Sequence, residues 1–185
     1  EEAYEAVDAL DLDDPVLMCE ELGDVLMQVA FHTCMEQETG RFTWEQVCDG
    51  VCQKLIERHP NIFGTQPGYE GITDWDALKN KEKGRRTLAD DLESVPRAMP
   101  ALMRAAKLQK RAARHGAALQ GADAAALADA AENLQTAQPA SAQAEQAVGE
   151  LLFAAANLAR QAGVDPEQAL QKANEAFCTA AGPVA

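Results

Sequence analysis

Residues 15–31, PVLMCEELGDVLMQVAF, form the stretch that decides the fold. Its apolar residues recur at spacings of three and four, which places them on one face of a helix. Asp13 or Asp14 can cap the start of this helix, because a short acidic side chain accepts backbone N–H groups there and Pro15 suits the first turn. Gly40 is a natural stop. The pattern therefore predicts a long amphipathic helix that ends near residue 40.

Two further helices flank this one. Residues 1–10 have the same helical spacing of apolar positions, and an acidic break at residues 11–15 separates them from the long helix. Thr43, with Gln46 three residues later, is typical of a capping box and predicts a third helix to about Arg58. The residues from 59 to 73 contain Pro60 and three glycines, which indicates a loop.

The second half of the chain is also helical in pattern. We predict helices over about 98–114 and 141–162, and a last helix from Asp165 to about residue 180. Residues 117–147 are rich in alanine. No segment alternates with a period of two, so the predicted class is all-α.

An internal repeat relates the two halves of the chain. LGDVL at residues 22–26 recurs as VGELL at residues 148–152, and Gly40 with Thr43 recurs as Gly163 with Asp165. We therefore predict a helical bundle of two tandem units, residues 1–95 and residues 96–185.

The two copies differ at polar positions. Ala147 stands where the first copy has Glu21, and alanines 176 and 180 stand where it has Lys54 and Arg58. The acidic residues at the start of the first copy are reduced to about Asp129 and Glu132. We interpret the second unit as a degenerate scaffold or dimerisation half.

Composition excludes several classes of function. The chain has 185 residues, 47% of them hydrophobic, and a formal net charge of -14. Nucleic acids and anionic membranes favour basic surfaces, so neither is an expected partner. No stretch is apolar enough to span a membrane and no signal peptide is visible. We expect a cytoplasmic location, and we expect the five cysteines to be reduced, small, buried side chains.

Two pairs of carboxylates carry the chemistry. Glu2 and Glu5 share a face of the first helix, and Glu21 and Asp24 share a face of the second, because residues three apart lie on the same side. If the helices fold back at residues 11–15, the four groups meet and repel one another. A hard divalent cation relieves that repulsion. The alternative is that all four are charged residues on solvated faces.

Basic residues follow at a suitable spacing for phosphate. Lys54 and Arg58 lie one turn apart at a predicted helix end and can hold phosphate oxygens together with Lys79 and Lys83. The alternative is a solvated basic face. Trp75 either stacks on a base or fills the core.

Taken together, these motifs resemble the MazG family of nucleoside triphosphate pyrophosphohydrolases. The resemblance rests on their order and spacing over nearly the whole chain, and includes these segments: EEAYE (1–5), EELGD (20–24), KLIERHPNIFG (54–64), WDALK (75–79), VPRAMPAL (95–102), KLQKRAA (107–113) and GVDPEQAL (163–170).

That resemblance implies an all-α fold of two MazG-like units, completed by homodimerisation. It implies Mg²⁺-dependent hydrolysis of NTPs or dNTPs to the monophosphate and pyrophosphate, with Mn²⁺ as a substitute. Glu2, Glu5, Glu21 and Asp24 would then be the metal ligands. The catalytic residues would be Glu21, Lys54 and Arg58, and the nucleotide-binding residues Lys54, Arg58, Trp75, Lys79 and Lys83.

The degenerate second unit motivates a rival hypothesis. In relatives with two units, the second unit can be the catalytic one, and here it lacks the motif glutamate and the basic stretch. The alternative function is therefore a catalytically weak or inactive nucleotide-sensing or assembly module of the same fold. A related pyrophosphohydrolase with another substrate, such as a modified dNTP or a nucleotide sugar, is a third candidate.

Overall fold

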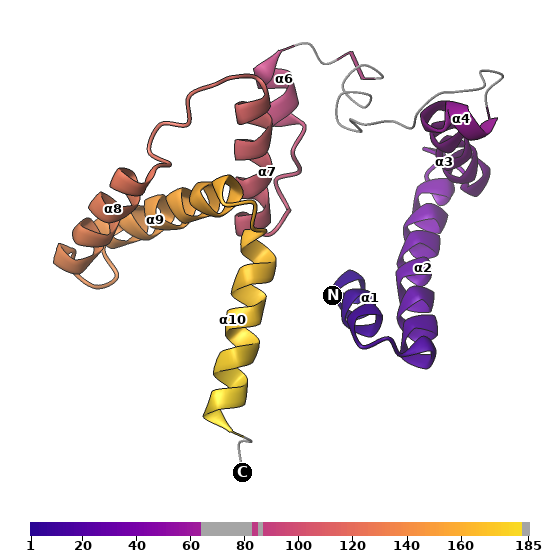
Figure 1. The fold of residues 1–185 in the computed structure, drawn as a ribbon. Helices are drawn as coiled ribbons and strands as arrows, with labels where there is room; N and C mark the ends of the chain where they lie inside the picture. Colours follow the sequence, from indigo (N-terminus) through magenta and orange to yellow (C-terminus); the bar gives the residue numbers. More distant parts are fainter. Residues whose placement is uncertain (64–82, 85–86, 183–185) are drawn as a thin grey trace. The chain divides into compact units, whose positions relative to one another are not determined.

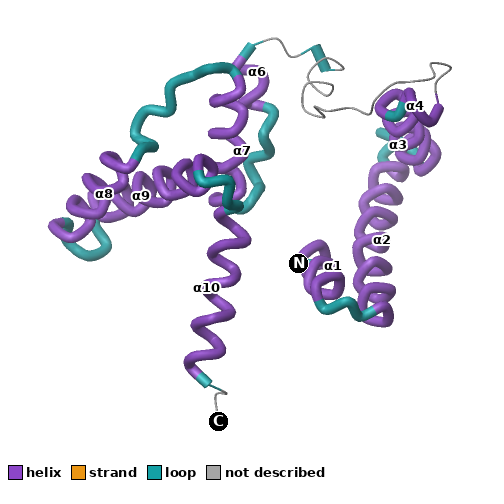
Figure 2. Tube along the Cα trace, in the orientation of Figure 1, coloured by secondary structure: helices purple, strands orange, loops and turns teal. Residues whose placement is uncertain are grey.

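The computed structural model describes residues 1–63, 83–84 and 87–182, and all regular structure in this part of the chain is helical (Figures 1 and 2). The all-α prediction is confirmed. The helices are α1 (Glu2–Asp11), α2 (Pro15–Glu38), α3 (Trp44–Arg58), α4 (Pro60–Phe63), α6 (Leu88–Glu93), α7 (Ala101–Arg114), α8 (Ala124–Thr136), α9 (Ala142–Gln161) and α10 (Pro166–Ala181). Within the described residues, no helix is long and apolar enough to cross a membrane.

The chain divides into two compact units, Glu1–Leu78 and Lys79–Ala185. In the first, α1 packs against α2, and α3 contacts α2 and α4. In the second, α7 contacts α6, α9 and α10, while α8 packs along α9. Because α6 packs against α7, the residues from 88 to 95 belong with the second unit, although the sequence pattern placed a boundary after them.

Local signals set the ends of α1 and α2. The Asp14 carboxylate accepts the backbone N–H groups of Val16 and Leu17 at 2.9 and 3.1 Å, so the predicted cap is Asp14 rather than Asp13. Asp13 itself adopts a positive φ of 53° in the turn. α2 ends at Glu38, and Gly40 follows with a φ of 69°, a conformation in which glycine is least strained.

The predicted start of α3 is confirmed, whereas the prediction of a loop after this helix is partly wrong. Thr43 and Gln46 form the predicted capping box, with each side chain bonded to the other residue's backbone N–H. Residues 60–63, however, form the short helix α4 instead of a loop. Proline is well tolerated at a first helical position because its missing N–H would have no intrahelical partner there, so Pro60 ends α3 and begins α4.

Buried amide side chains tie the helices of the second unit together. Gln109 on α7 is 1% exposed and donates a hydrogen bond to the carbonyl of Phe153 on α9 at 2.7 Å. Asn157, also on α9, donates to the carbonyl of Ala122 in the loop before α8 at 2.6 Å. Each bond satisfies a polar group inside an alanine-rich core, whose small side chains let the helices approach closely.

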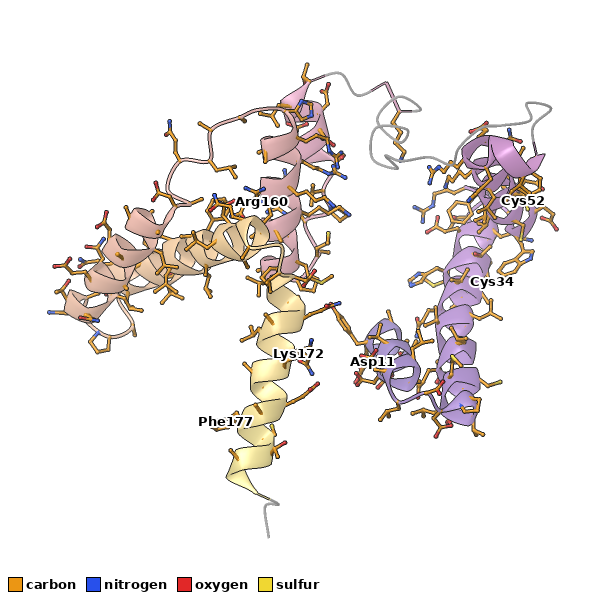
Figure 3. All side chains as sticks on the ribbon, in the orientation of Figure 1. Asp11, Cys34, Cys52, Arg160, Lys172 and Phe177 are labelled. Carbon is orange, nitrogen blue, oxygen red and sulfur yellow. The ribbon has the colours of Figure 1, made fainter. Side chains whose placement is uncertain are left out.

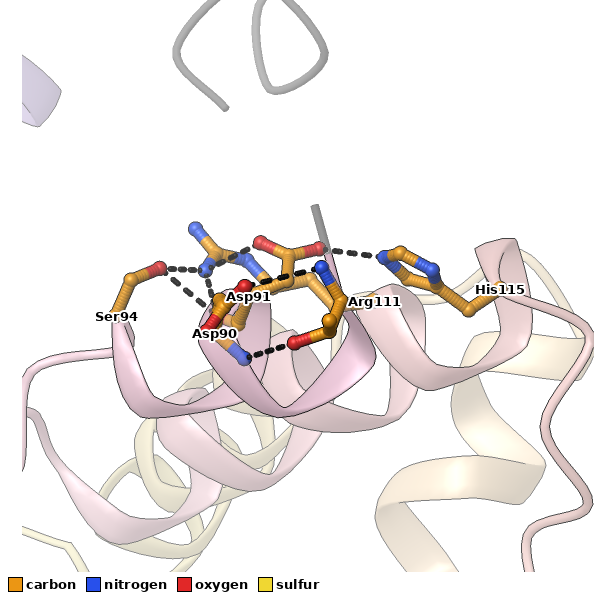
Figure 4. Close-up of polar contacts among 6 residues, drawn as sticks. Asp90, Asp91, Ser94, Arg111 and His115 are labelled. Carbon is orange, nitrogen blue, oxygen red and sulfur yellow. Dashed lines mark hydrogen bonds and ion pairs between the residues drawn. The ribbon is translucent and has the colours of Figure 1, made fainter. Parts of the chain in front are cut away.

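A charged cluster fastens α6 to α7 (Figure 4). The Arg111 guanidinium lies 2.9 Å from Asp91 Oδ1 and donates hydrogen bonds to the Asp91 carbonyl and to Ser94 Oγ. His115 Nε2 lies 3.2 Å from the other carboxylate oxygen, Asp91 Oδ2. The Asp91 side chain is 1% exposed, and each oxygen of this buried carboxylate has a partner, Arg111 for one and His115 for the other.

The first unit keeps little of its apolar surface covered. Only two alanines of α1 and Thr33 of α2 are buried among its described residues, and large side chains such as Leu26 and Phe31 are 58% and 60% exposed. All five cysteines are exposed, so the prediction that they are buried is wrong. Four of them lie on exposed faces of α2 and α3.

The last helix also presents an uncovered face. α10 contacts α7 and α9, and its described residues are almost all exposed. Phe177 is 73% exposed and points away from the helix on a different side from Lys172 (Figure 3).

Candidate active site on helices α1 and α2

The turn between α1 and α2 brings the two acidic pairs onto one surface. The two helices run antiparallel and bury Ala6 and Ala9 of α1 between them. Their register places the first residues of α1 beside Gln28 of α2, whose Nε2 donates a hydrogen bond to Glu2 Oε1 at 3.4 Å. In that register, Glu5 lies closer than Glu2 to the part of α2 that carries Glu21 and Asp24.

The carboxylates on this surface disfavour one another's ionisation. Partial desolvation raises the pKa of Glu5, and the negative charges of Glu2, Glu1 and Asp24 raise it further. Desolvation likewise raises the pKa of Glu21, with Glu5 the largest electrostatic contributor and Asp24 the next. The four predicted ligands therefore interact electrostatically across the two helices, and charged residues on separate solvated faces would not do so.

The donor set suits a hard divalent cation. Mg²⁺ and Mn²⁺ prefer carboxylate oxygens, and a cation relieves the repulsion that raises these two pKa values. Among the described residues, no three acidic, histidine or cysteine side chains converge closely enough to hold an ion as they stand. All four side chains are half-buried or exposed, so none is locked in the core of the unit.

The predicted phosphate-binding residues are placed only in part. Lys54 is exposed and Arg58 is half-buried on α3, one turn apart as expected. α3 begins at the far end of α2, roughly 20 Å along the axis from Asp24, and its main contacts are with α2 and α4. The first unit by itself therefore does not gather this pair with the carboxylates. Lys83 is exposed, and Trp75 and Lys79 lie outside the described residues.

Comparisons with known proteins show which family has a sequence like this one. The MazG nucleotide pyrophosphohydrolase domain matches residues 1–63, which include α1 to α4. A nucleoside triphosphate pyrophosphohydrolase of Escherichia coli K12 is 39% identical over 186 residues, covering 96% of this chain and 71% of the relative. A nucleoside triphosphate pyrophosphohydrolase/pyrophosphatase MazG of Thermotoga maritima is 38% identical over 179 residues, covering 96% and 69%. This chain belongs to the MazG family.

A third relative matches a shorter part of the chain. The nucleoside triphosphate pyrophosphohydrolase of Mycobacterium tuberculosis is 36% identical over 120 residues, which cover 63% of this chain and 36% of the relative. The matched family domain ends at residue 63, so the second unit is recognised through whole-chain relatives and not through the domain itself.

The second unit has a groove between two of its packed helices. The groove lies between α8 and α9 and encloses about 720 Å³. Asp129 and Asn133 of α8 and Glu150 of α9 line it, whereas Glu132 does not. Ala147, at the position of Glu21, is buried and 2% exposed. No described residue that lines the groove is basic, so this site lacks the charges that a triphosphate needs.

Sequence reasoning missed one polar residue of the first MazG unit. Gln28 lies four residues after Asp24 and therefore on the same side of α2. A single glutamine within an apolar run has no motif to mark it. Its helical spacing from Asp24 was the available signal, and the contact with Glu2 depends on the register between two helices, which the sequence does not specify.

Proposed function

We propose that this chain hydrolyses nucleoside triphosphates, NTPs or dNTPs, to the monophosphate and pyrophosphate in a reaction that depends on Mg²⁺. The observation that carries the proposal is the acidic surface of α1 and α2, which holds four carboxylates that influence one another, two of them with raised pKa values. The names of the relatives from Escherichia coli and Thermotoga maritima support the reaction class.

The proposed roles follow from charge and position. Glu2, Glu5, Glu21 and Asp24 hold the ion. Bound there, Mg²⁺ neutralises charge on the triphosphate and lowers the pKa of a water. Glu21 orients the attacking water and accepts its proton, as a carboxylate next to the scissile group can. The attack of this water breaks the phosphoanhydride bond between the α and β phosphates, and pyrophosphate leaves.

The basic residues complete the proposal. Lys54, Arg58 and Lys79 stabilise the negative charge that develops on the phosphoryl oxygens, while Lys83 and Trp75 contact the nucleotide. Lys54 and Arg58 lie on α3, which begins at the end of α2 that is far from the carboxylates. We therefore propose that assembly brings these two residues to the site. The uncovered apolar side chains of the first unit support a homodimer, since such a surface is costly to leave in water.

A panel of NTPs and dNTPs with Mg²⁺, assayed for both pyrophosphate and orthophosphate, tests this function. We expect pyrophosphate and monophosphate as products, and we expect Glu21→Gln and Asp24→Asn to abolish turnover while circular dichroism shows unchanged helicity. Glu38→Gln is the matched control, because it removes a carboxylate from the other end of α2. Unchanged turnover in both site variants would contradict the assignment.

A second function has its own supporting observation. Ala147 is buried and the groove of the second unit lacks basic residues, which suits a nucleotide-sensing or assembly module without turnover. Nucleotide binding or dimerisation in a folded protein that forms no product in the same panel would favour this alternative.

A further inference from the structure

The contact between Gln28 and Glu2 joins the two helices of the acidic surface. Gln28 Nε2 donates to Glu2 Oε1 at 3.4 Å, across 26 residues of sequence. The buried side chains between the helices are alanines 6 and 9, which provide contact area but little directional restraint. The polar contact therefore restrains the Glu2 side chain itself, while burial of the two alanines holds α1 against α2.

Gln28 shares a face of α2 with the predicted metal ligands. Glu21, Asp24 and Gln28 follow at spacings of three and four, which align side chains along a helix. Glu5 lies near Glu21, because its negative charge is the largest electrostatic contributor to the raised pKa of Glu21. Glu2 lies further along α2, opposite Gln28.

We propose that Gln28 is a positioning residue of the metal site, which orients the Glu2 carboxylate by donating a hydrogen bond to one of its oxygens. This inference rests on the function proposed above. Donation to Oε1 leaves Oε2 to face the cation, as hydrogen bonds from a second layer of residues commonly orient metal-binding carboxylates. An amide suits this position because it donates without adding charge to a surface that already holds four carboxylates.

A neutral donor has a specific advantage over the other residues that could reach Glu2. A lysine would pair with the carboxylate and compete with the metal for it. A glutamate would add to the repulsion that already raises the pKa of Glu5 and Glu21. A leucine would leave Glu2 free to turn toward solvent. The amide alone restrains the carboxylate and keeps it available.

The test compares the full-length protein with Gln28→Leu and with Gln37→Leu, a control that removes an exposed glutamine from the far end of the same helix. Mn²⁺ affinity is measured by titration without nucleotide. Backbone hydrogen exchange of α1 is measured in the metal-free proteins. We expect Gln28→Leu to weaken Mn²⁺ binding about tenfold, the lower end of the range for second-layer residues. We expect exchange at Ala9 to change less than about twofold, because burial holds α1 in place.

The outcomes separate this inference from the proposed function. If the unaltered protein binds no Mn²⁺, the metal site is refuted and Gln28 has nothing to position. If it binds Mn²⁺ and Gln28→Leu binds equally well, only the role of Gln28 is refuted. If affinity falls together with faster exchange throughout α1, Gln28 merely holds the helix, and the inference is again refuted. Loss of affinity with unchanged exchange, absent in Gln37→Leu, supports it.

Discussion

Replacing Arg111 with methionine removes the cation that the core of the second unit depends on. Methionine fills a similar volume but cannot pair with Asp91, whose side chain is 1% exposed. Arg111 Nη1 lies 2.9 Å from the carboxylate and also donates to the Asp91 carbonyl and to Ser94 Oγ. The substitution therefore leaves the buried carboxylate, the buried carbonyl of Asp91 and the half-buried hydroxyl of Ser94 with fewer partners.

The expected loss follows from the burial of this pair. Removing one member of a buried ion pair typically costs about 3–5 kcal/mol, because the remaining charge stays desolvated. His115 still approaches Asp91 Oδ2 at 3.2 Å, so we expect the lower end, about 3 kcal/mol. For a unit of roughly 100 residues, that loss lowers the melting temperature by about 15 °C.

Urea unfolding followed by circular dichroism measures the loss, and hydrogen exchange locates it. Exchange should accelerate most in residues 88–95, because the cluster is what fastens α6 to α7. Arg41→Met is the control: its pair with Glu36 spans 2.6 Å, but the Arg41 side chain is 67% exposed. An exposed pair is worth about 1 kcal/mol or less.

Two results would refute this reasoning. The first is a loss for Arg111→Met no larger than that for Arg41→Met, which would mean that the buried carboxylate finds water or another partner at little cost. The second concerns the double variant Asp91→Leu/Arg111→Met. Because replacing a whole buried pair with apolar side chains is often neutral, the double variant should recover most of the loss. Equal losses in the single and double variants would show that packing, and not charge, is responsible.

Two further predictions concern the acidic surface and its counterpart. In metal-free protein, the raised pKa of Glu5 and of Glu21 means that their stabilising contribution is complete below the usual value of 4.5 and is lost as the pH rises through the raised pKa. Glu5→Gln and Glu21→Gln should therefore gain stability relative to the unaltered protein as the pH rises from about 4 to 7; a difference in melting temperature that stays flat would contradict this. Ala147→Glu, which restores the motif residue in the second unit, should cost at least about 2 kcal/mol, because the position is 2% exposed and has no room for a charged side chain. Urea unfolding at neutral pH measures the loss, and a variant as stable as the parent would show that the site can open.

The features that sequence predicted best depend on residues close together in the chain. The capping box of Thr43 and Gln46 and the Asp14 cap require only three or four consecutive residues, so local chemistry decides them. The same holds for the i, i+3 pairs of carboxylates. The packing of α1 against α2 could also be predicted, because a short break between two amphipathic helices favours antiparallel packing.

The features that sequence missed depend on contacts between distant segments. α6 is six residues long, too short for a periodic pattern, and its ion pair joins Asp91 to a residue 20 positions later. The contact of Gln28 with Glu2 requires the exact register of two helices. The separation of Lys54 from the carboxylates could not be predicted for the same reason, since spacing along α3 says nothing about the direction in which that helix leaves α2.

The internal repeat preserves backbone geometry and changes the chemistry placed on it. Gly40 and Gly163 follow α2 and α9 with φ values of 69° and 72°, so both long helices end in the same left-handed turn. At the matching position within those helices, however, Glu21 is half-buried and charged, whereas Ala147 is buried and 2% exposed. Burial of that position removes any place for a metal ligand and adds core to the second unit, which already holds the buried Asp91–Arg111 pair. The first unit has the reverse character, with the proposed metal ligands on its surface and few buried side chains among its described residues. Stability and chemistry are therefore divided between the two units, so core substitutions in the second should change unfolding more than metal affinity, and substitutions on α1 and α2 should do the opposite.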